Sequence, residues 1–233
     1  MNFSRGLFAL ILTLFLHSSL FANYLYKDEL IFNPAFSAEV EKLGSELYEK
    51  TGISLRLLML KELPHGKNMV AYEQEILNEF GQPTVLLTFS QKDTKVDILA
   101  NEPSLYSLFD KKQILSPVAS PVQSFVIALF YSDSFDSFKE LASSYGGTII
   151  PLLAQKAKDS ELLGKYSGSM FNGYADIAEQ IAANKGIVLE NAVGNTNKDS
   201  IFFVKVLFYG FILYAIFLYI KRKIYMRKQN ESK

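Results

Sequence analysis

The sequence predicts an α/β fold, with a mixed, mostly parallel sheet that has an antiparallel hairpin edge, helices on both faces and one C-terminal transmembrane helix. Between residues 37 and 99, segments with apolar residues at helical spacing alternate with short continuous apolar runs, as in parallel strands joined by helices. The turn Gln91–Thr94 separates the last two runs and favours an antiparallel pair. A further apolar segment near the C-terminus is long enough to cross a bilayer.

The elements of the first half follow from their boundary residues. Ser37 can cap a helix that Gly52 ends, because a hydroxyl accepts from free N–H groups and glycine tolerates a positive φ. The next run contains a single charge, Arg56, as expected for a central strand. Gly81 and Pro83 end the following helix. The predicted elements are helix Ser37–Lys50, strand Ile53–Leu60, helix Met69–Phe80 and the hairpin strands Thr84–Phe89 and Lys95–Leu99.

The second half is less regular. Phe125–Tyr131 fits a buried strand or a helix, and the preceding Ser120-Pro121 favours the helix. Residues 116–147 contain eight serines and are predicted to form an exposed insertion within the domain. The other predicted segments are helices Leu105–Leu115, Phe135–Tyr145, Thr148–Lys158 and Met170–Lys185 and a polar linker, Asn191–Ser200.

Residues 1–22 are typical of a secretory signal peptide. Arg5 precedes the apolar stretch Gly6–Leu16, and about eleven helical residues span much less than the ~30 Å of hydrocarbon in a bilayer. Cleavage is predicted after Ala22, with an uncleaved anchor as the alternative. A cleaved signal exports the domain that follows, residues 23–190.

Ile201–Ile220 is predicted to be a transmembrane helix. Its twenty residues include one charge, Lys205, and form roughly 30 Å of helix. A buried core helix is the alternative, but such a helix is seldom apolar on every side. The basic tail, residues 221–233, places the C-terminus in the cytoplasm by the positive-inside rule.

The charges divide at this predicted span. The whole chain has 24 Lys and Arg against 24 Asp and Glu, but Asn23–Ser200 has 16 bases and 23 acids, and the tail has six bases and one acid. The acidic domain argues against nucleic acid as a partner. The absence of cysteine excludes thiol nucleophiles, Cys-bound zinc and iron–sulfur clusters.

Few residues are candidates for chemistry. His65 lies in a Pro-His-Gly turn and is expected to be a solvated loop residue. The sequence has no Gly-rich phosphate-binding motif. Asp28, Asp97 and Glu102 could meet at one end of the hairpin and bind Ca²⁺ or Mg²⁺ through their carboxylates. The alternative is that they are solvent-facing acids of strands and turns.

Aromatic residues gather in the expected insertion. Core packing is the ordinary explanation for such residues. The alternative is a docking surface close to the membrane for a membrane or periplasmic protein. The candidate partner-binding residues are Phe125, Phe130, Tyr131, Phe135 and Phe138.

The order of these segments resembles the TPM domain, a membrane-associated α/β domain of bacterial envelopes and thylakoids. The segment Tyr24–Asp28 precedes a helix ending in Lys50-Thr51-Gly52, a strand, a helix ending in Phe80-Gly81, and the hairpin. Ile149–Leu152 and Gly173–Ile181 resemble the closing helices of that family.

The resemblance implies two possible activities. Some TPM domains are reported as acid phosphatases with acidic, cation-binding residues, and others are linked to the maintenance of membrane complexes. Asp28 is the nearest match to an early family Asp. The chain has Gly81-Gln82-Pro83 in place of a family Asp-Asn-Gly, and Ala100-Asn101 close to the position of a family glycine.

Together these observations predict a single-pass protein of the bacterial inner membrane, with a periplasmic domain and a cytoplasmic C-terminus. The TPM-like domain is expected to be a noncatalytic binding, assembly or maintenance module for a membrane or periplasmic protein complex. The alternative is a divalent-cation-dependent acid phosphatase, a phosphomonoester hydrolase with a carboxylate site. Only the alternative requires a cofactor, Ca²⁺ or Mg²⁺.

Overall fold

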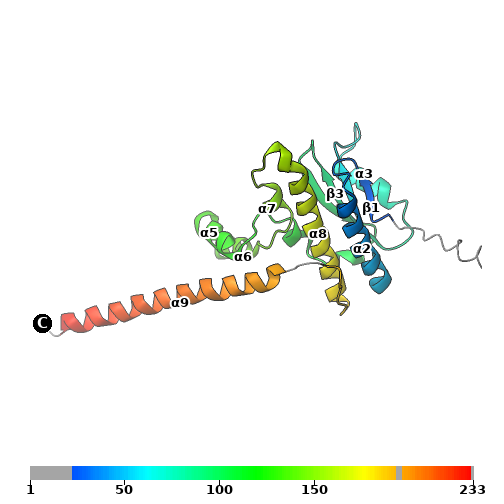
Figure 1. The fold of residues 1–233 in the computed structure, drawn as a ribbon. Helices are drawn as coiled ribbons and strands as arrows, with labels where there is room; N and C mark the ends of the chain where they lie inside the picture. The colour runs from blue at the N-terminus through cyan, green and yellow to red at the C-terminus, as the bar shows by residue number, and fades with distance from the viewer. Residues whose placement is uncertain (1–22, 193–195, 232–233) are drawn as a thin grey trace, which may run out of the picture.

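The computed structural model describes residues 23–192 and 196–231, so the predicted signal peptide lies outside the described residues. One mixed sheet has the strand order β1-β2-β3-β4 (Figure 1). The pairs β1/β2 and β2/β3 are parallel, and β3/β4 is antiparallel. The predicted mixed sheet with a hairpin edge is confirmed. Its strands are β1 (Leu25–Asp28), β2 (Ser54–Leu60), β3 (Thr84–Ser90) and β4 (Lys95–Ala100).

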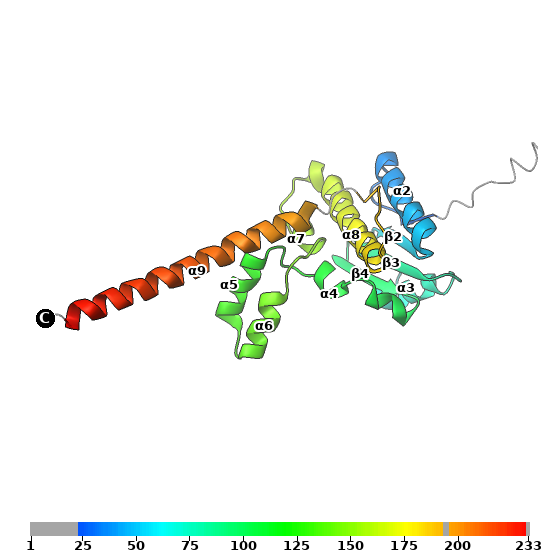
Figure 2. The same cartoon turned by 90° about the horizontal axis from the view of Figure 1, so that it is seen from below.

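Helices cover both faces of the sheet, as predicted (Figure 2). α2 (Pro34–Thr51) and α8 (Leu162–Asn184) pack on one face, and α3 (Met69–Leu77) packs on the other. α2 connects β1 to β2 and α3 connects β2 to β3, and both connections move one strand in the same direction. Because these two helices lie on opposite faces, the two crossovers have opposite handedness, and one departs from the usual right-handed rule.

The larger core lies between the sheet and the layer formed by α2 and α8. Leu55 and Leu57 of β2 are fully buried there, as are Leu43 and Leu47 of α2. Tyr174 of α8 is also buried, and its hydroxyl donates to the Leu55 carbonyl oxygen at 2.8 Å. This bond satisfies two polar groups that have no access to water.

α2 begins one turn earlier than predicted. The cap is Asn33 rather than Ser37, because the Asn33 side chain accepts from the N–H of Ala35 at 2.9 Å and Pro34 occupies the start of the helix. The predicted end is confirmed: Gly52 has a φ of 73° and donates its N–H to a carbonyl of the last turn.

Gly44→Ala is expected to lower the free energy of unfolding by roughly 1–3 kcal/mol, because the close packing of α2 leaves no room for a side chain. A Cβ at Gly44 would lie 2.4 Å from the Tyr24 ring and 2.5 Å from the Tyr174 hydroxyl oxygen. Gly164→Ala in α8 is the control, since a Cβ there meets nothing within 4 Å. It is expected to stabilise the fold by roughly 0.5–1 kcal/mol. Urea unfolding of the detergent-solubilised chain measures both changes, and equal effects at the two sites would contradict this packing.

The segment that follows β4 contains two short helical pieces instead of the predicted helix Leu105–Leu115. They are the 3₁₀ turn η1 (Pro103–Ser107) and α4 (Lys111–Ile114). Asp110 interrupts the run, and its carboxylate accepts from the N–H of Gln113 at 2.9 Å, which caps α4.

The two helices that return to the sheet differ in length from the prediction. α7 spans only Ile150–Leu153, much less than the predicted Thr148–Lys158. α8 follows the 3₁₀ turn η2 (Asp159–Glu161) and starts at Leu162, well before the predicted Met170. Glycine and serine are frequent in the first part of α8 and obscure its helical periodicity.

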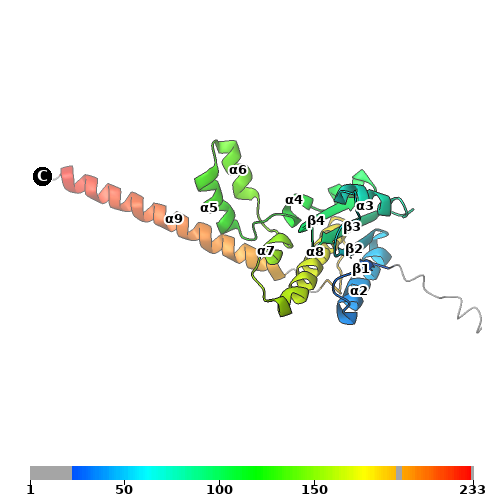
Figure 3. The same cartoon turned by 90° about the horizontal axis from the view of Figure 1, so that it is seen from above.

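The expected insertion contains a helical hairpin. α5 (Pro121–Tyr131) and α6 (Phe135–Ser143) pack against each other, and α5 also contacts α9 (Thr196–Glu231) (Figure 3). The helical alternative for the α5 segment is confirmed, with Ser120 accepting from the N–H of Gln123 at its start. α9 starts at Thr196, within residues 191–200, the segment predicted to be a polar linker.

The chain after α8 folds back onto α2 through Glu46. The Glu46 carboxylate accepts from the N–H groups of Glu190 at 2.6 Å and Asn191 at 2.8 Å, and from Lys50 Nζ at 2.7 Å. Burial alone would raise its pKa, but these hydrogen bonds outweigh burial and lower the pKa of Glu46 to about 2. The segment that leads to α9 is therefore fixed to the domain as far as Asn191.

Candidate functional site

The clearest candidate surface is the hairpin of α5 and α6, residues 121–143, which we call the aromatic hairpin. Large apolar side chains there are open to solvent in the absence of a membrane or partner. Several such side chains on one hairpin are a candidate interaction surface. The exposed fractions are 44% for Val126, 57% for Leu129, 80% for Phe130, 74% for Tyr131 and 80% for Phe135.

The five predicted partner-binding residues divide into two groups. Phe130, Tyr131 and Phe135 are exposed and available for contact. Phe125 and Phe138 are only partly exposed, and their rings meet edge to face with centroids 5.7 Å apart. This pair holds α5 against α6 and contributes structure to the surface more than contact area.

The aromatic hairpin is joined to the start of α9. The Phe125 ring also contacts the Phe208 ring of α9, with centroids 5.5 Å apart. Just beyond the hairpin, the centroid of the Tyr145 ring lies 4.7 Å from Lys205 Nζ. Among the described residues, α9 contains the one segment, Phe203–Arg227, that is long and apolar enough to cross a membrane.

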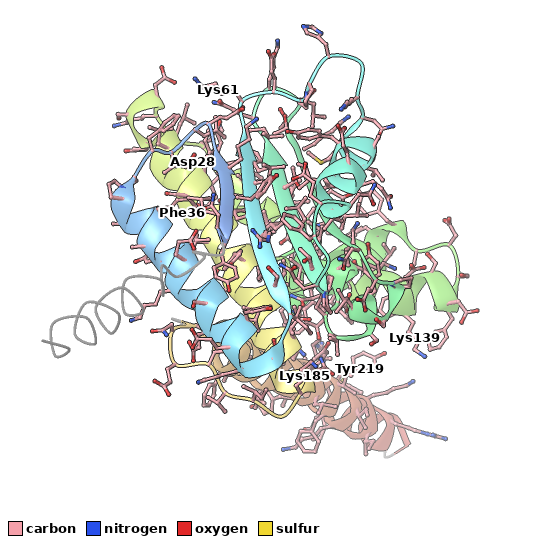
Figure 4. The ribbon with its side chains drawn as sticks, turned by 90° about the vertical axis from the view of Figure 1, so that its right-hand side faces the viewer. Asp28, Phe36, Lys61, Lys139, Lys185 and Tyr219 are labelled. Atoms are coloured by element: carbon pink, nitrogen blue, oxygen red, sulfur yellow. The ribbon has the colours of Figure 1, made fainter. Side chains whose placement is uncertain are left out.

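The first of the proposed metal ligands, Asp28, stabilises a turn. Its carboxylate accepts three backbone hydrogen bonds, from the N–H groups of Leu30, Ile31 and Phe32, at 2.8–2.9 Å. Figure 4 shows Asp28 at the end of β1, near the start of α2 where Phe36 is labelled. These bonds engage both carboxylate oxygens. They give Asp28 a structural role in the turn that requires no metal ion.

The other two proposed ligands lie elsewhere in the sheet. Asp97 is on β4, which two strands separate from β1, and pairs with Lys111 Nζ at 2.6 Å. Glu102 is exposed and follows the end of β4 that lies beside the start of β3, opposite the end that carries Asp28. Among the described residues no three acidic or histidine side chains are placed to hold a metal ion. The three residues therefore do not fit a shared Ca²⁺ or Mg²⁺ site.

A buried polar cluster that the sequence analysis missed lies between α3 and the hairpin strands. Glu73 of α3 is fully buried, and within the described residues neither of its carboxylate oxygens has a hydrogen-bond partner of ordinary geometry. Burial raises the pKa of Glu73 to about 8; the nearby Thr88 hydroxyl opposes this rise and the Asp97 carboxylate adds to it. The spacing of Met69, Glu73 and Ile76 places all three on one helix face. This pattern is the feature of the sequence from which the burial of Glu73 could have been predicted.

Burial raises the pKa of Glu73 well above its ordinary value and closes the carboxyl off from solvent, so it cannot meet a substrate in this conformation. His65, by contrast, is exposed in its turn, as predicted. Among the described residues, the apolar surface of the aromatic hairpin therefore remains the clearest candidate site.

The fold and this surface define an α/β domain joined to one candidate membrane-spanning helix. No protein-family model matches the chain, and no curated protein matches it either.

Proposed function

We propose that this chain is a single-span envelope protein whose TPM-like domain is a noncatalytic binding, assembly or maintenance module for a membrane or periplasmic protein complex. In this proposal α9 crosses the bacterial inner membrane, the domain lies in the periplasm and the C-terminus is cytoplasmic. Support comes from the apolar segment Phe203–Arg227 and from the basic residues at and beyond its end. The order of the segments, which resembles a TPM domain, adds to it.

The observation that carries the proposal is the exposure of Phe130, Tyr131 and Phe135 on a hairpin whose Phe125 contacts α9. Large apolar side chains are costly to expose, and aromatic side chains are enriched at interfaces. The position of the aromatic hairpin favours a partner that is itself at the membrane.

We expect photocrosslinking in membranes to detect such a partner at the aromatic hairpin. A photoreactive phenylalanine analogue at Phe130 and one at Phe135 should give the same protein adduct. The matched control is Val70 on α3, which is 49% exposed but distant from α9 in the fold, and it should give no such adduct. Adducts that form equally at Val70, or at neither hairpin position, would contradict the proposed surface.

The alternative phosphatase function requires two or three carboxylates around one ion, with room for a substrate. Asp28, Asp97 and Glu102 lie apart, and each of them already has a hydrogen-bond or ion-pair partner in the domain. We expect the purified full chain to hydrolyse a generic phosphomonoester no faster with Mg²⁺ or Ca²⁺ than without. Cation-dependent turnover that is lost in Asp97→Asn would overturn this expectation.

A further inference from the structure

We infer that the aromatic hairpin lies in the interfacial layer of the same lipid bilayer that α9 crosses, with α5 facing the acyl chains. The partner assigned here is lipid. The inference rests on the proposed insertion of α9, but it does not require a protein partner. It adds to the proposed function by naming what surrounds the exposed aromatic side chains.

α5 exposes large apolar residues that a water-soluble helix would bury. Small residues face inward, since Ser124 is 1% exposed and Ala128 is fully buried. The large apolar residues Val126, Leu129 and Phe130 share one face and point outward. A soluble helix turns its apolar face to the core, whereas small residues at helix contacts and large apolar residues outside are typical of helices in lipid.

The contact with α9 places the hairpin near the start of the candidate span. Phe208, which touches Phe125 of α5, is five residues beyond Phe203, the first described residue of the apolar segment, and seven beyond Ile201, where the predicted transmembrane helix begins. At 1.5 Å per residue these two starting points place the contact roughly 7–11 Å along the span. Interfacial helices bury their apolar faces about 5–10 Å below the headgroup boundary. Lys205 and Tyr145 meet slightly nearer the start of the span, at the level where charged and aromatic side chains commonly anchor helices.

The backbone of the hairpin meets the requirements of a site with little water. α5 contains no charged residue. The hydroxyls of Ser120 and Ser134 accept from the N–H groups of Gln123 and Ser137 and so cap the two helices. The Ser124 hydroxyl donates to the Leu141 carbonyl oxygen across the hairpin. Helices whose polar groups are satisfied internally can enter the interface at low cost.

The charge of the hairpin points to an apolar mode of binding. Asp133, Asp136 and Glu140 outnumber its one base, Lys139. A hairpin that bound anionic headgroups by charge would need an excess of Lys or Arg. We therefore expect insertion into zwitterionic lipid without any requirement for anionic lipid. A protein partner that reaches Phe130 would have to be embedded in the same bilayer.

The absence of tryptophan allows a direct test with single-Trp variants of the full chain. Phe130→Trp reports on the hairpin, Phe211→Trp on α9, and Val70→Trp on the domain surface; all three side chains are at least 49% exposed. Each variant is reconstituted into protein-free phosphatidylcholine vesicles, with and without lipids brominated on the acyl chains. Unchanged circular dichroism and thermal unfolding verify that each variant is folded.

The expected result is a blue-shifted emission for F130W that is quenched by brominated lipid and protected from aqueous iodide. F211W should behave in the same way, and V70W should be quenched by iodide alone. Quenching of F211W but not F130W by brominated lipid would overturn the inference and leave the proposed anchoring and the crosslinking result intact. Quenching of neither would overturn the inference together with the assignment of α9 as a span.

Discussion

Replacing Glu73 with Gln should remove a pH dependence of stability that the wild-type protein shows between about pH 4.5 and 8. The buried carboxyl of the folded protein keeps its proton up to about pH 8, whereas the unfolded chain loses it near the ordinary value of 4.5. Between these values the folded state binds one more proton. The free energy of unfolding therefore falls as the pH rises, by about 1.4 kcal/mol per pH unit.

The stabilising contribution of Glu73 is thus complete below the lower pKa and is lost as the pH rises through the upper one. Glu73→Gln is neutral at every pH and should be more stable than the wild-type protein above about pH 8. Urea unfolding across this range measures both slopes. In Thr88→Val, which lacks the hydroxyl that opposes the rise in pKa, the decline should extend to higher pH. A wild-type stability that does not change over this range would contradict the account of an unpaired, buried carboxyl.

Asp28→Ala should lower the free energy of unfolding by roughly 2–4 kcal/mol, because three backbone N–H groups lose a charged acceptor at once. The turn also holds Phe32 at a φ of 49°, a conformation that is rare for a residue with a large side chain. Without the carboxylate the turn has less to offset this strain. Thermal unfolding of the two proteins at one pH measures the change.

Asp28→Asn is the matched control for this prediction. Its one remaining side-chain oxygen can still accept from Leu30 and Ile31, as Oδ1 does now, while the bond from Phe32 to Oδ2 is lost. The expected loss is smaller, about 1 kcal/mol. Ca²⁺ or Mg²⁺ should leave the wild-type unfolding temperature unchanged, and a rise that Asp28→Asn abolishes would restore Asp28 as a metal ligand.

The sheet was largely predictable, because β2, β3 and β4 are determined by local patterns. Arg56 did not obscure β2, since its guanidinium lies 4.1 Å from the Phe80 ring and donates to the Asn23 carbonyl oxygen. β1 was not predicted as a strand. It has four residues, two of them charged, and becomes a strand only through pairing with β2. Pairing of that kind is not encoded within the segment itself.

The candidate surfaces were predictable only in part. The concentration of aromatic residues indicated a surface near the membrane, but the rotation of α5 that hides Phe125 and exposes Phe130 depends on contacts with α6 and α9. The predicted metal site of Asp28, Asp97 and Glu102 did not form, because residues at different strands and ends of one sheet need not meet. Glu73 was missed because a glutamate on a helix is usually a solvated residue.

The attachment of the chain to Glu46 limits how far the domain can move from the membrane. Ala192 still packs against the core, and α9 begins at Thr196. Four residue steps reach at most roughly 15 Å even when fully extended. With α9 inserted in a bilayer as proposed, the domain would stay within this distance of the start of α9, and a soluble partner would have to approach the bilayer surface to bind it.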